Sequence, residues 1–327
     1  MSITQFDVVQ ANAFLGTDIQ GQGKSYYVNP YYGTGSSGRS PRTAIKTLAG
    51  ALAKCTTNRN DTVHLLAGHA DLDYTTDFQP ATLDWNLNLT HLIGIPRGVN
   101  ICPRARVAFL SSYDAASNLF TVSGNACVFR NLLFFAGVAG TLPTGCLKVS
   151  GERNLFENCH IAGIGHDNND IANAYSLYLS GSENVFRNCV IGLDTISRGT
   201  ADNAEVVLAG GARNQFIDCL FVTFAGANTH QFVKRALSGS DRFTLFKRCH
   251  FTNFDWTAGG GVTMLEVMDV TPSGSPGGFI DLIDCSFAGA AAWEASSGAS
   301  GIVRANTSAA AAASATSGGR ALAVTGA

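Results

Sequence analysis

The sequence predicts an all-β protein, a parallel β-helix in which each coil of about 30 residues holds three short strands. Two observations carry this prediction: one phrase recurs at a fixed interval, and apolar residues alternate inside it. The phrase reads N-L-F-E-N-C-H-I at 154–161, and related phrases follow at 184–191, 214–221 and 244–251. A fixed interval with a fixed apolar pattern is typical of one structural unit stacked on itself.

The composition agrees with an all-β fold and argues against two classes of partner. Of the 327 residues, 46% are apolar, only 14% are charged and 36 are glycine, which suits short strands joined by many turns. The formal net charge is −2 and Lys and Arg form no run, so we expect no nucleic-acid binding. No stretch of about 18 unbroken apolar residues is present, so we expect no membrane span.

The N-terminal residues and the number of cysteines indicate where the protein is made and whether it forms disulfides. The start, M-S-I-T-Q-F-D-V-V-Q, has no basic region and no apolar core, which predicts synthesis in a cytoplasm without a signal peptide. Nine cysteines, an odd number in a chain of this length, do not resemble a disulfide framework.

One coil can be traced residue by residue through the second repeat. Inward-facing residues two apart mark three short strands, at 147–149, 154–156 and 159–161. Phe156 and Cys159 are three apart, so both face inward only if the chain bends at about Glu157-Asn158. Three strands and their bends enclose a triangular core.

Equivalent residues of neighbouring coils should stack about 4.8 Å apart and form ladders. The repeat spacings of 27, 30, 30, 30 and 36 indicate a constant strand frame with loops of variable length. The predicted ladders are aromatic, amide and thiol: Phe129, Phe156, Phe186, Phe216 and Phe246; Asn154, Asn184 and Asn214; and Cys159, Cys189, Cys219, Cys249 and Cys285.

The thiol ladder has two interpretations, a metal or redox array and a column of small core residues. The C-x-x-C spacing of a structural zinc site is missing. Stacked side chains also point in parallel rather than toward one another, which disfavours disulfides. We therefore interpret the cysteines as core residues and expect no metal and no cofactor.

These phrases resemble the right-handed single-stranded parallel β-helix of the pectate-lyase-like superfamily over about 85–290. Upstream, the order Y-Y-V-N-P…G-S-S-G-R-S-P-R-T-A-I-K-T-L…D-T-V-H-L-L-A-G-H is similar to the entry segment of many β-helix proteins, phage virion proteins among them. Ser40-Pro41 and the stripe after it predict a helix over about 42–55. The expected organisation is an arm (1–25), a cap (26–84), the β-helix (85–290) and an Ala/Ser/Gly-rich arm (291–327).

Candidate catalytic residues lie in the loops that follow each Cys-x-Ile/Phe strand, because these loops should gather on one side of the stack. Carboxylates one or two coils apart would lie about 5–10 Å from each other, which overlaps the spacing in glycosidases. An Arg could instead act as the base of a lyase, with Asp residues holding Ca²⁺. The candidates are Asp167, Asp170, Asp194, Arg198, Asp202 and Glu205, with His166, Asn169, His230, Lys234 and Arg235 nearby.

The competing interpretation is that these loops collect Asp and Asn for turn geometry alone. No carboxylate repeats at the coil period, so we expect no catalytic residue among them. Gly23-Lys24-Ser25 is not a phosphate-binding loop, because Asp18 stands where the first glycine is required.

Three functions remain open. The preferred hypothesis is a structural virion protein of a tailed bacteriophage, a head decoration (cement) protein on the capsid exterior that binds the major capsid protein as a homotrimer. The second is a tailspike or tail-associated glycosidase or lyase that acts on surface polysaccharide. The third is a non-catalytic tail or fibre adhesin.

Overall fold

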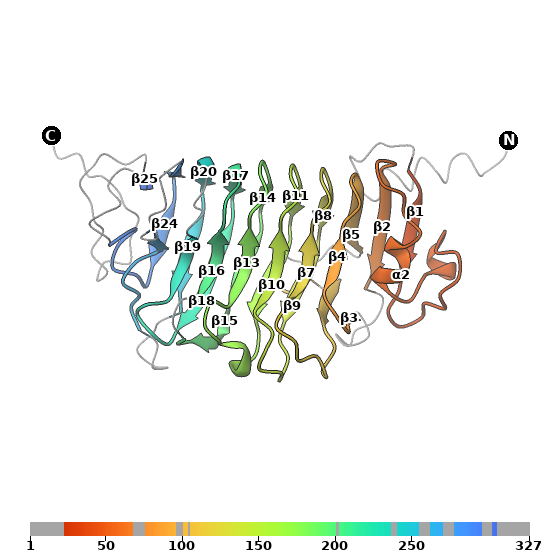
Figure 1. Ribbon diagram of the computed structural model, residues 1–327, viewed down its shortest axis with the longest axis horizontal. Helices are drawn as coiled ribbons and strands as arrows, with labels where there is room; N and C mark the ends of the chain where they lie inside the picture. The colour runs from red at the N-terminus through yellow and green to blue at the C-terminus, as the bar shows by residue number, and fades with distance from the viewer. Residues whose placement is uncertain are drawn as a thin grey trace.

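The chain forms a right-handed parallel β-helix, in which three parallel sheets run the length of an elongated stack (Figure 1). The computed structural model describes residues 23–67, 76–95, 101–103, 105–200, 203–236, 241–254, 262–270, 278–295 and 303–305. Each regular coil visits sheet C, then sheet A, then sheet B, before a loop returns the chain to sheet C one level along.

Sheet A is the longest of the three, with ten strands in the described residues. Its strands are β1 (Ser25–Val28), β2 (Asp61–Leu66), β5 (Thr90–Ile95), β8 (Val128–Arg130), β11 (Leu155–Glu157), β14 (Val185–Arg187), β17 (Ala212–Ile217), β20 (Asp241–Lys247), β23 (Gly278–Ile283) and β25 (Val303–Ala305).

Sheets B and C contribute eight and seven described strands. Sheet B holds β3 (Thr76–Gln79), β6 (Arg106–Phe109), β9 (Leu133–Ala136), β12 (His160–Ile164), β15 (Val190–Arg198), β18 (Leu220–Ala225), β21 (His250–Asn253) and β24 (Ser286–Ala288). Sheet C holds β4 (Leu83–Trp85), β7 (Asn118–Val122), β10 (Gly145–Val149), β13 (Tyr175–Leu179), β16 (Ala204–Leu208), β19 (Gln231–Arg235) and β22 (Met268–Asp269).

The bend between sheets A and B is made by a single residue in the left-handed region, which confirms the bend predicted at Glu157-Asn158. Asn158 has φ 53°, and the residue before each inward Cys or its equivalent behaves alike. Asparagine and aspartate tolerate this conformation because their short polar side chains bond locally. The set, with φ of 51° to 58°, is Asn131, Asn158, Asn188, Asp218, Arg248 and Asp284.

The aromatic ladder forms as predicted and occupies the centre of the core. Phe129, Phe156, Phe186, Phe216 and Phe246 are all fully buried. Successive ring centroids lie 4.7 to 4.8 Å apart, with interplanar angles of 5° to 11°. The parallel register places each ring directly on its equivalent, so strand spacing sets the ring spacing.

The asparagine ladder is also confirmed, and its hydrogen bonds connect each coil to the one before. Asn184 Oδ1 accepts from Asn154 N at 3.0 Å, while Asn184 Nδ2 donates to Gly151 O at 3.0 Å. Asn154 and Asn214 repeat both bonds. At this turn, the residue whose backbone adopts positive φ is the one before the asparagine, such as Glu183 with φ 60°.

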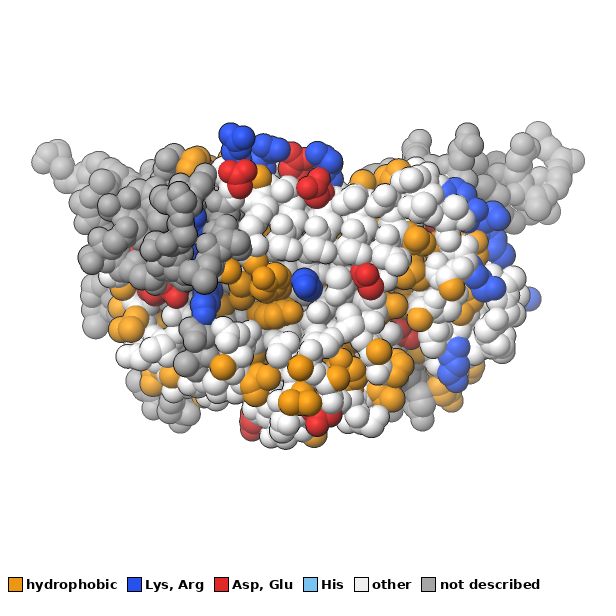
Figure 2. All heavy atoms as spheres, in the orientation of Figure 1, with side chains coloured by type: hydrophobic (Ala, Val, Ile, Leu, Met, Phe, Trp, Pro, Cys, Tyr) orange, Lys and Arg blue, Asp and Glu red, His pale blue; other side chains and the backbone are white. Residues whose placement is uncertain are grey.

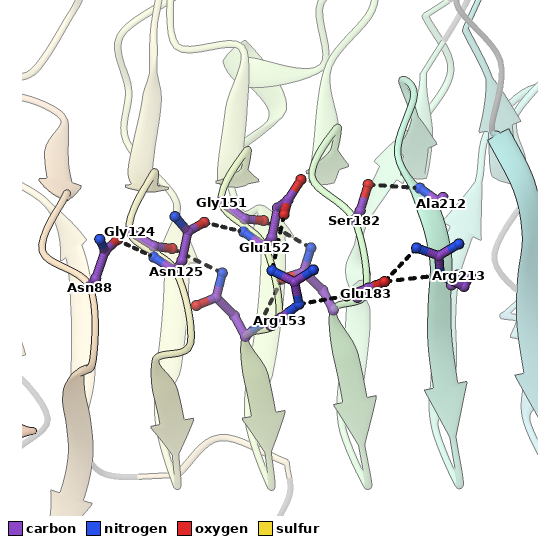
Figure 3. Close-up of polar contacts among 12 residues, drawn as sticks. Asn88, Gly124, Asn125, Gly151, Glu152, Arg153, Ser182, Glu183, Ala212 and Arg213 are labelled. Carbon is purple, nitrogen blue, oxygen red and sulfur yellow. Dashed lines mark hydrogen bonds and ion pairs between the residues drawn. The ribbon is translucent and has the colours of Figure 1, made fainter. Parts of the chain in front are cut away.

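Figure 3 shows a second, exposed row beside these asparagines, at the turn from sheet C to sheet A. Arg153 Nε lies 2.6 Å from Glu183 Oε2, and Arg213 Nη2 lies 2.5 Å from Glu183 Oε1. Asn125 Oδ1 accepts from Glu152 N at 2.7 Å. Surface charges at this turn therefore neutralise one another along the stack, with the modest energy of exposed pairs.

The thiols form a column of core residues. Cys159, Cys189, Cys219, Cys249 and Cys285 are buried and free. Each Sγ lies near the carbonyl oxygen of the ladder phenylalanine one coil back, at 3.3 to 3.5 Å. These weak S–H donors replace apolar side chains without leaving a polar atom unpaired.

The predicted cap and its helix need correction. Strands β1 to β4 already belong to the three sheets, so the stack begins at Ser25 rather than at 85. The predicted helix over 42–55 is replaced by a 3₁₀ turn at Pro41–Thr43 and a short helix, α2, at Leu48–Leu52. The chain is extended between them because Ile45 N donates to Tyr27 O at 2.8 Å, forming a bridge beside β1.

The predicted arms lie mostly outside the described residues, at 1–22, 296–302 and 306–327. Within the predicted C-terminal arm, β25 continues sheet A by pairing with β23, so the stack extends beyond 290. No helix among the described residues is long and apolar enough to cross a membrane.

Truncating one ring tests the aromatic ladder. Phe186→Ala should lower the free energy of unfolding by about 3–5 kcal/mol, because it removes a fully buried ring from a stacked column. Denaturant titration measures the loss. Phe254→Ala is the matched control, since this ring is 55% exposed and should change stability little. Equal effects of the two substitutions would contradict the ladder.

Thiol accessibility tests the cysteine column. Cys102 is exposed and should react with an aromatic disulfide reagent at once, while the half-buried Cys55, whose pKa burial raises to about 12, should react slowly. Seven buried thiols should react only after denaturation. More than two reactive thiols in the native protein would show that the column is open to solvent.

Candidate functional site

The predicted flank exists: the loops between sheets B and C gather the candidate residues along one edge of the stack. Their roles differ. Asp170 is held by the next coil: its carboxylate accepts from Gly199 N at 2.9 Å, from Thr200 N at 3.1 Å and from the Asn203 amide, while the Thr200 hydroxyl donates to its backbone oxygen at 2.6 Å. A carboxylate accepting this many bonds ties two loops together and has little capacity left for a ligand.

The remaining carboxylate candidates do not form one constellation with Asp170. Asp167, in the 3₁₀ turn η3 (Asp167–Asn169), is exposed, and so is Asp194 within β15. Asp202 lies outside the described residues.

Arg198 and Glu205 are brought together, and they form the centre of a buried polar network. Glu205, on β16, lies 3.5 Å from Arg198 Nη2 and 3.4 Å from His230 Nε2. Thr223 Oγ1 donates to Glu205 Oε1 at 2.9 Å, and the Ser176 hydroxyl donates to the other carboxylate oxygen. The ion-pair side chains are 2% exposed or less.

Two glycines make room for this carboxylate. A Cβ at Gly192 would lie 2.8 Å from Glu205 Cδ, and one at Gly163 would lie 1.9 Å from Ser176 Oγ. Both glycines also adopt positive φ, 99° and 60°. The backbone of sheet B therefore approaches Glu205 more closely than any other residue type would permit.

Electrostatics keep Glu205 ionised inside the stack. Burial alone raises the pKa of its carboxyl, but the charge of Arg198 and the bonds from His230 and Ser176 outweigh burial and lower the pKa to about 2. In the described part of the chain, the three guanidinium nitrogens of Arg198 have no hydrogen-bond partner. Arg198 therefore serves Glu205 as a buried counter-charge.

Arg235, on β19, is a second buried cation that the sequence does not single out from its neighbours. Its register partner in β16 is Leu208, so Arg235 stands at an inward position of sheet C. It is 1% exposed, and burial lowers the pKa of its guanidinium. Lys234 occupies the alternate, outward position.

Sequence reasoning missed Ser176, Thr223 and the two glycines. The signal for Ser176 was available, because it occupies the same register position as Glu205 one coil earlier. Finding Thr223 requires the spatial arrangement of sheets B and C, which no sequence interval encodes.

Within the described ranges, no group of three or more His, Cys, Asp or Glu side chains is arranged to hold a metal ion. The Glu205 network contains one carboxylate, one imidazole and a guanidinium, and a cation would compete there with Arg198. This arrangement can hold charges apart from water and stiffen the loop flank, but its closed packing gives a substrate no access to these atoms.

No protein-family model matches the chain, and a search of curated proteins gave no match. Among solved structures, pectate lyase Pel9A is similar with a TM-score of 0.54 at 15% identity, covering 83% of this chain and 64% of its own. The chain thus spans less than two thirds of that lyase.

Two further similarities are weaker. Pectin methylesterase PemA from Erwinia chrysanthemi gives a TM-score of 0.46 at 15% identity, covering 86% of this chain and 92% of its own. Tailspike protein 2 of Escherichia coli O157:H7 bacteriophage CAB120 gives 0.34 at 9% identity, covering 72% and 39%. At these identities, the likeness to Pel9A establishes the pectate-lyase-like fold and nothing about activity.

Removing the central charge tests the buried network. Glu205→Gln should lower the free energy of unfolding by about 3–5 kcal/mol, because it leaves Arg198 buried without a counter-charge. Asp194→Asn, at an exposed carboxylate, should have little effect. A stable Glu205→Gln protein would contradict the assigned role.

The same network predicts a pH dependence. The pKa of Glu205 is lowered from 4.5 to about 2, so its stabilisation is complete above pH 4.5 and is lost as the pH falls toward 2. Chemical denaturation of wild type and Glu205→Gln at several pH values should therefore give a difference in stability that shrinks below pH 4.5. A difference that grows with acidity would reverse the sign and refute the assignment.

Proposed function

We propose that this protein is a structural component of a tailed bacteriophage virion, a decoration (cement) protein that binds neighbouring major capsid subunits on the capsid exterior. One observation carries the proposal: the strongest charged cluster of the flank, around Glu205, is sealed within the stack and engaged in stabilising it. The similarity of the entry segment to phage virion β-helices supports the same proposal.

The mechanism is adhesion by a rigid body. Ladders of rings, amides and thiols resist bending and twisting of the stack, so binding energy is not consumed in ordering the protein. A homotrimer would present several copies of each contact, and repeated weak contacts across a shell add through avidity.

A second candidate, a polysaccharide depolymerase, is favoured by one observation. Asp167 and Asp194 are exposed on the loop flank of neighbouring coils, where a sugar chain can reach them. The β-helix that carries these two aspartates is similar in fold to Pel9A, a pectate lyase. A tail adhesin without catalysis would share the scaffold.

Copy number in purified particles distinguishes head from tail. A decoration protein should be present in on the order of hundreds of copies, whereas about three to eighteen copies indicate a tail position. Quantitative mass spectrometry against the major capsid protein measures the ratio, and a tail-like ratio would contradict decoration.

Catalysis is tested separately with the host surface polysaccharide. The preferred proposal expects no release of oligosaccharides by purified protein. Depolymerisation that disappears in Asp167→Asn or Asp194→Asn, with folding intact by circular dichroism, would establish the enzyme instead.

A further inference from the structure

Charge is distributed unevenly along the chain. Residues 23–67 contain six Lys or Arg and a single Asp, a net charge of +5. Residues 1–22 contain two Asp and no cation, and residues 68–327 contain 16 cations and 21 anions, a net charge of −5. The protein has a formal net charge of −2, so its first coil opposes the rest of the chain in sign.

The single acid of this region does not neutralise its surface. Asp61 is fully buried and bonded to Arg59, with Arg59 Nη2 to Asp61 Oδ2 at 2.6 Å. The other five cations are exposed, and we call them the basic cap: Lys24, Arg39, Arg42, Lys46 and Lys54.

These cations lie at the N-terminal end of the stack, around β1, the 3₁₀ turn and α2 (Figure 1). Figure 2 shows Lys and Arg side chains gathered over that end of the molecule. Arg39 is held in place by donating Nη1 to Ser25 O at 2.8 Å and by lying 5.2 Å from the centre of the Tyr26 ring. The basic cap is therefore partly preorganised.

An exposed aromatic pair accompanies the charges. Tyr31 and Tyr32 are 40% and 66% exposed, with ring centroids 4.3 Å apart. Asn29 Oδ1 accepts from both of their backbone N–H groups, at 3.0 and 2.8 Å, which fixes the turn that presents the rings. Tyrosine and arginine are both enriched at protein–protein interfaces.

We propose that the basic cap and the Tyr31–Tyr32 pair form a docking surface for an acidic patch on a protein partner. This inference rests on the proposed function in one respect: in a virion, the partner would be the capsid. The five exposed cations carry one sign of charge, and no exposed Asp or Glu lies within the described residues 23–67. An acidic partner would reduce the repulsion among these cations while the tyrosines exclude water from the contact.

A protein patch fits better than a long polyanion. The cap is confined to the first coil, and a nucleic acid that continued past it would meet a chain segment with net charge −5. A compact acidic patch contacts the cap alone and avoids this repulsion.

The test uses the full-length protein and fluorescent poly-L-glutamate as the acidic polypeptide probe. Arg42→Glu/Lys46→Glu reverses two exposed charges of the cap. Arg187→Glu/Arg242→Glu reverses two charges that are 50% and 67% exposed on sheet A, giving the same change in net charge elsewhere. Fluorescence anisotropy is measured at about 50 and 200 mM salt, with double-stranded DNA as a parallel probe.

We expect the wild-type protein to bind poly-L-glutamate with an affinity that falls as the salt concentration rises. The affinity should fall about tenfold or more in the cap variant and stay unchanged in the sheet A variant. Equal losses in both variants, absence of binding at low salt, or tighter binding to DNA would each overturn the proposal. Circular dichroism confirms that both variants are folded.

Co-sedimentation with purified particles separates this proposal from the proposed function. Binding to poly-L-glutamate with the expected cap dependence, but no retention on phage capsids, would refute the decoration role and leave the acidic-partner surface standing. Retention on capsids that the cap variant leaves unchanged would refute the docking surface and preserve the decoration role.

Discussion

The vertical register between coils is the constraint on which the rest of the structure depends. Each strand pairs in parallel with its equivalent one coil away, so each side chain lies above a residue of the same position. This repetition favours residue types whose side chains pack well against identical side chains of the neighbouring coils. Phenylalanine stacks at 4.7 to 4.8 Å, asparagine bonds backward to the previous coil, and cysteine fills a small space while donating weakly to a carbonyl.

The same register makes charge difficult to place, since identical charges would stack as well. On the surface, the problem is met by alternating sign between coils, as in Arg153–Glu183–Arg213 (Figure 3). Inside, Glu205 is tolerated because hydroxyls, an imidazole and a guanidinium converge on it from neighbouring elements. In the first coil the one acid, Asp61, is buried and paired with Arg59, and the five exposed cations there have no exposed acid within residues 23–67.

The periodic part of the structure was predictable from sequence because the fold itself is periodic. The five rings, the asparagines, the cysteines and the bend at Asn158 all follow from spacing and alternation. Where an insertion breaks the period, spacing no longer shows that strands stack: Ser25 pairs with Thr62, 37 residues on, so the sequence predicts a cap over 26–84 where β1 and β2 already belong to sheet A. The candidate site was predictable only in part. Arg198 and Glu205 were recognised, but their burial and the role of Ser176 depend on how loops pack against sheets.

Deletion of one coil tests the central claim, that a coil is a unit defined by vertical register, most directly. Removing residues 160–189 joins Cys159 to Val190 and places Phe156 on Phe216, with the strand frame conserved. The account predicts a folded protein with a cooperative unfolding transition and β-rich circular dichroism. Removing residues 160–188 instead shifts the frame by one residue and should abolish folding, because inward and outward positions exchange. If the whole-coil deletion is unfolded, or if both deletions fold equally well, the account is wrong.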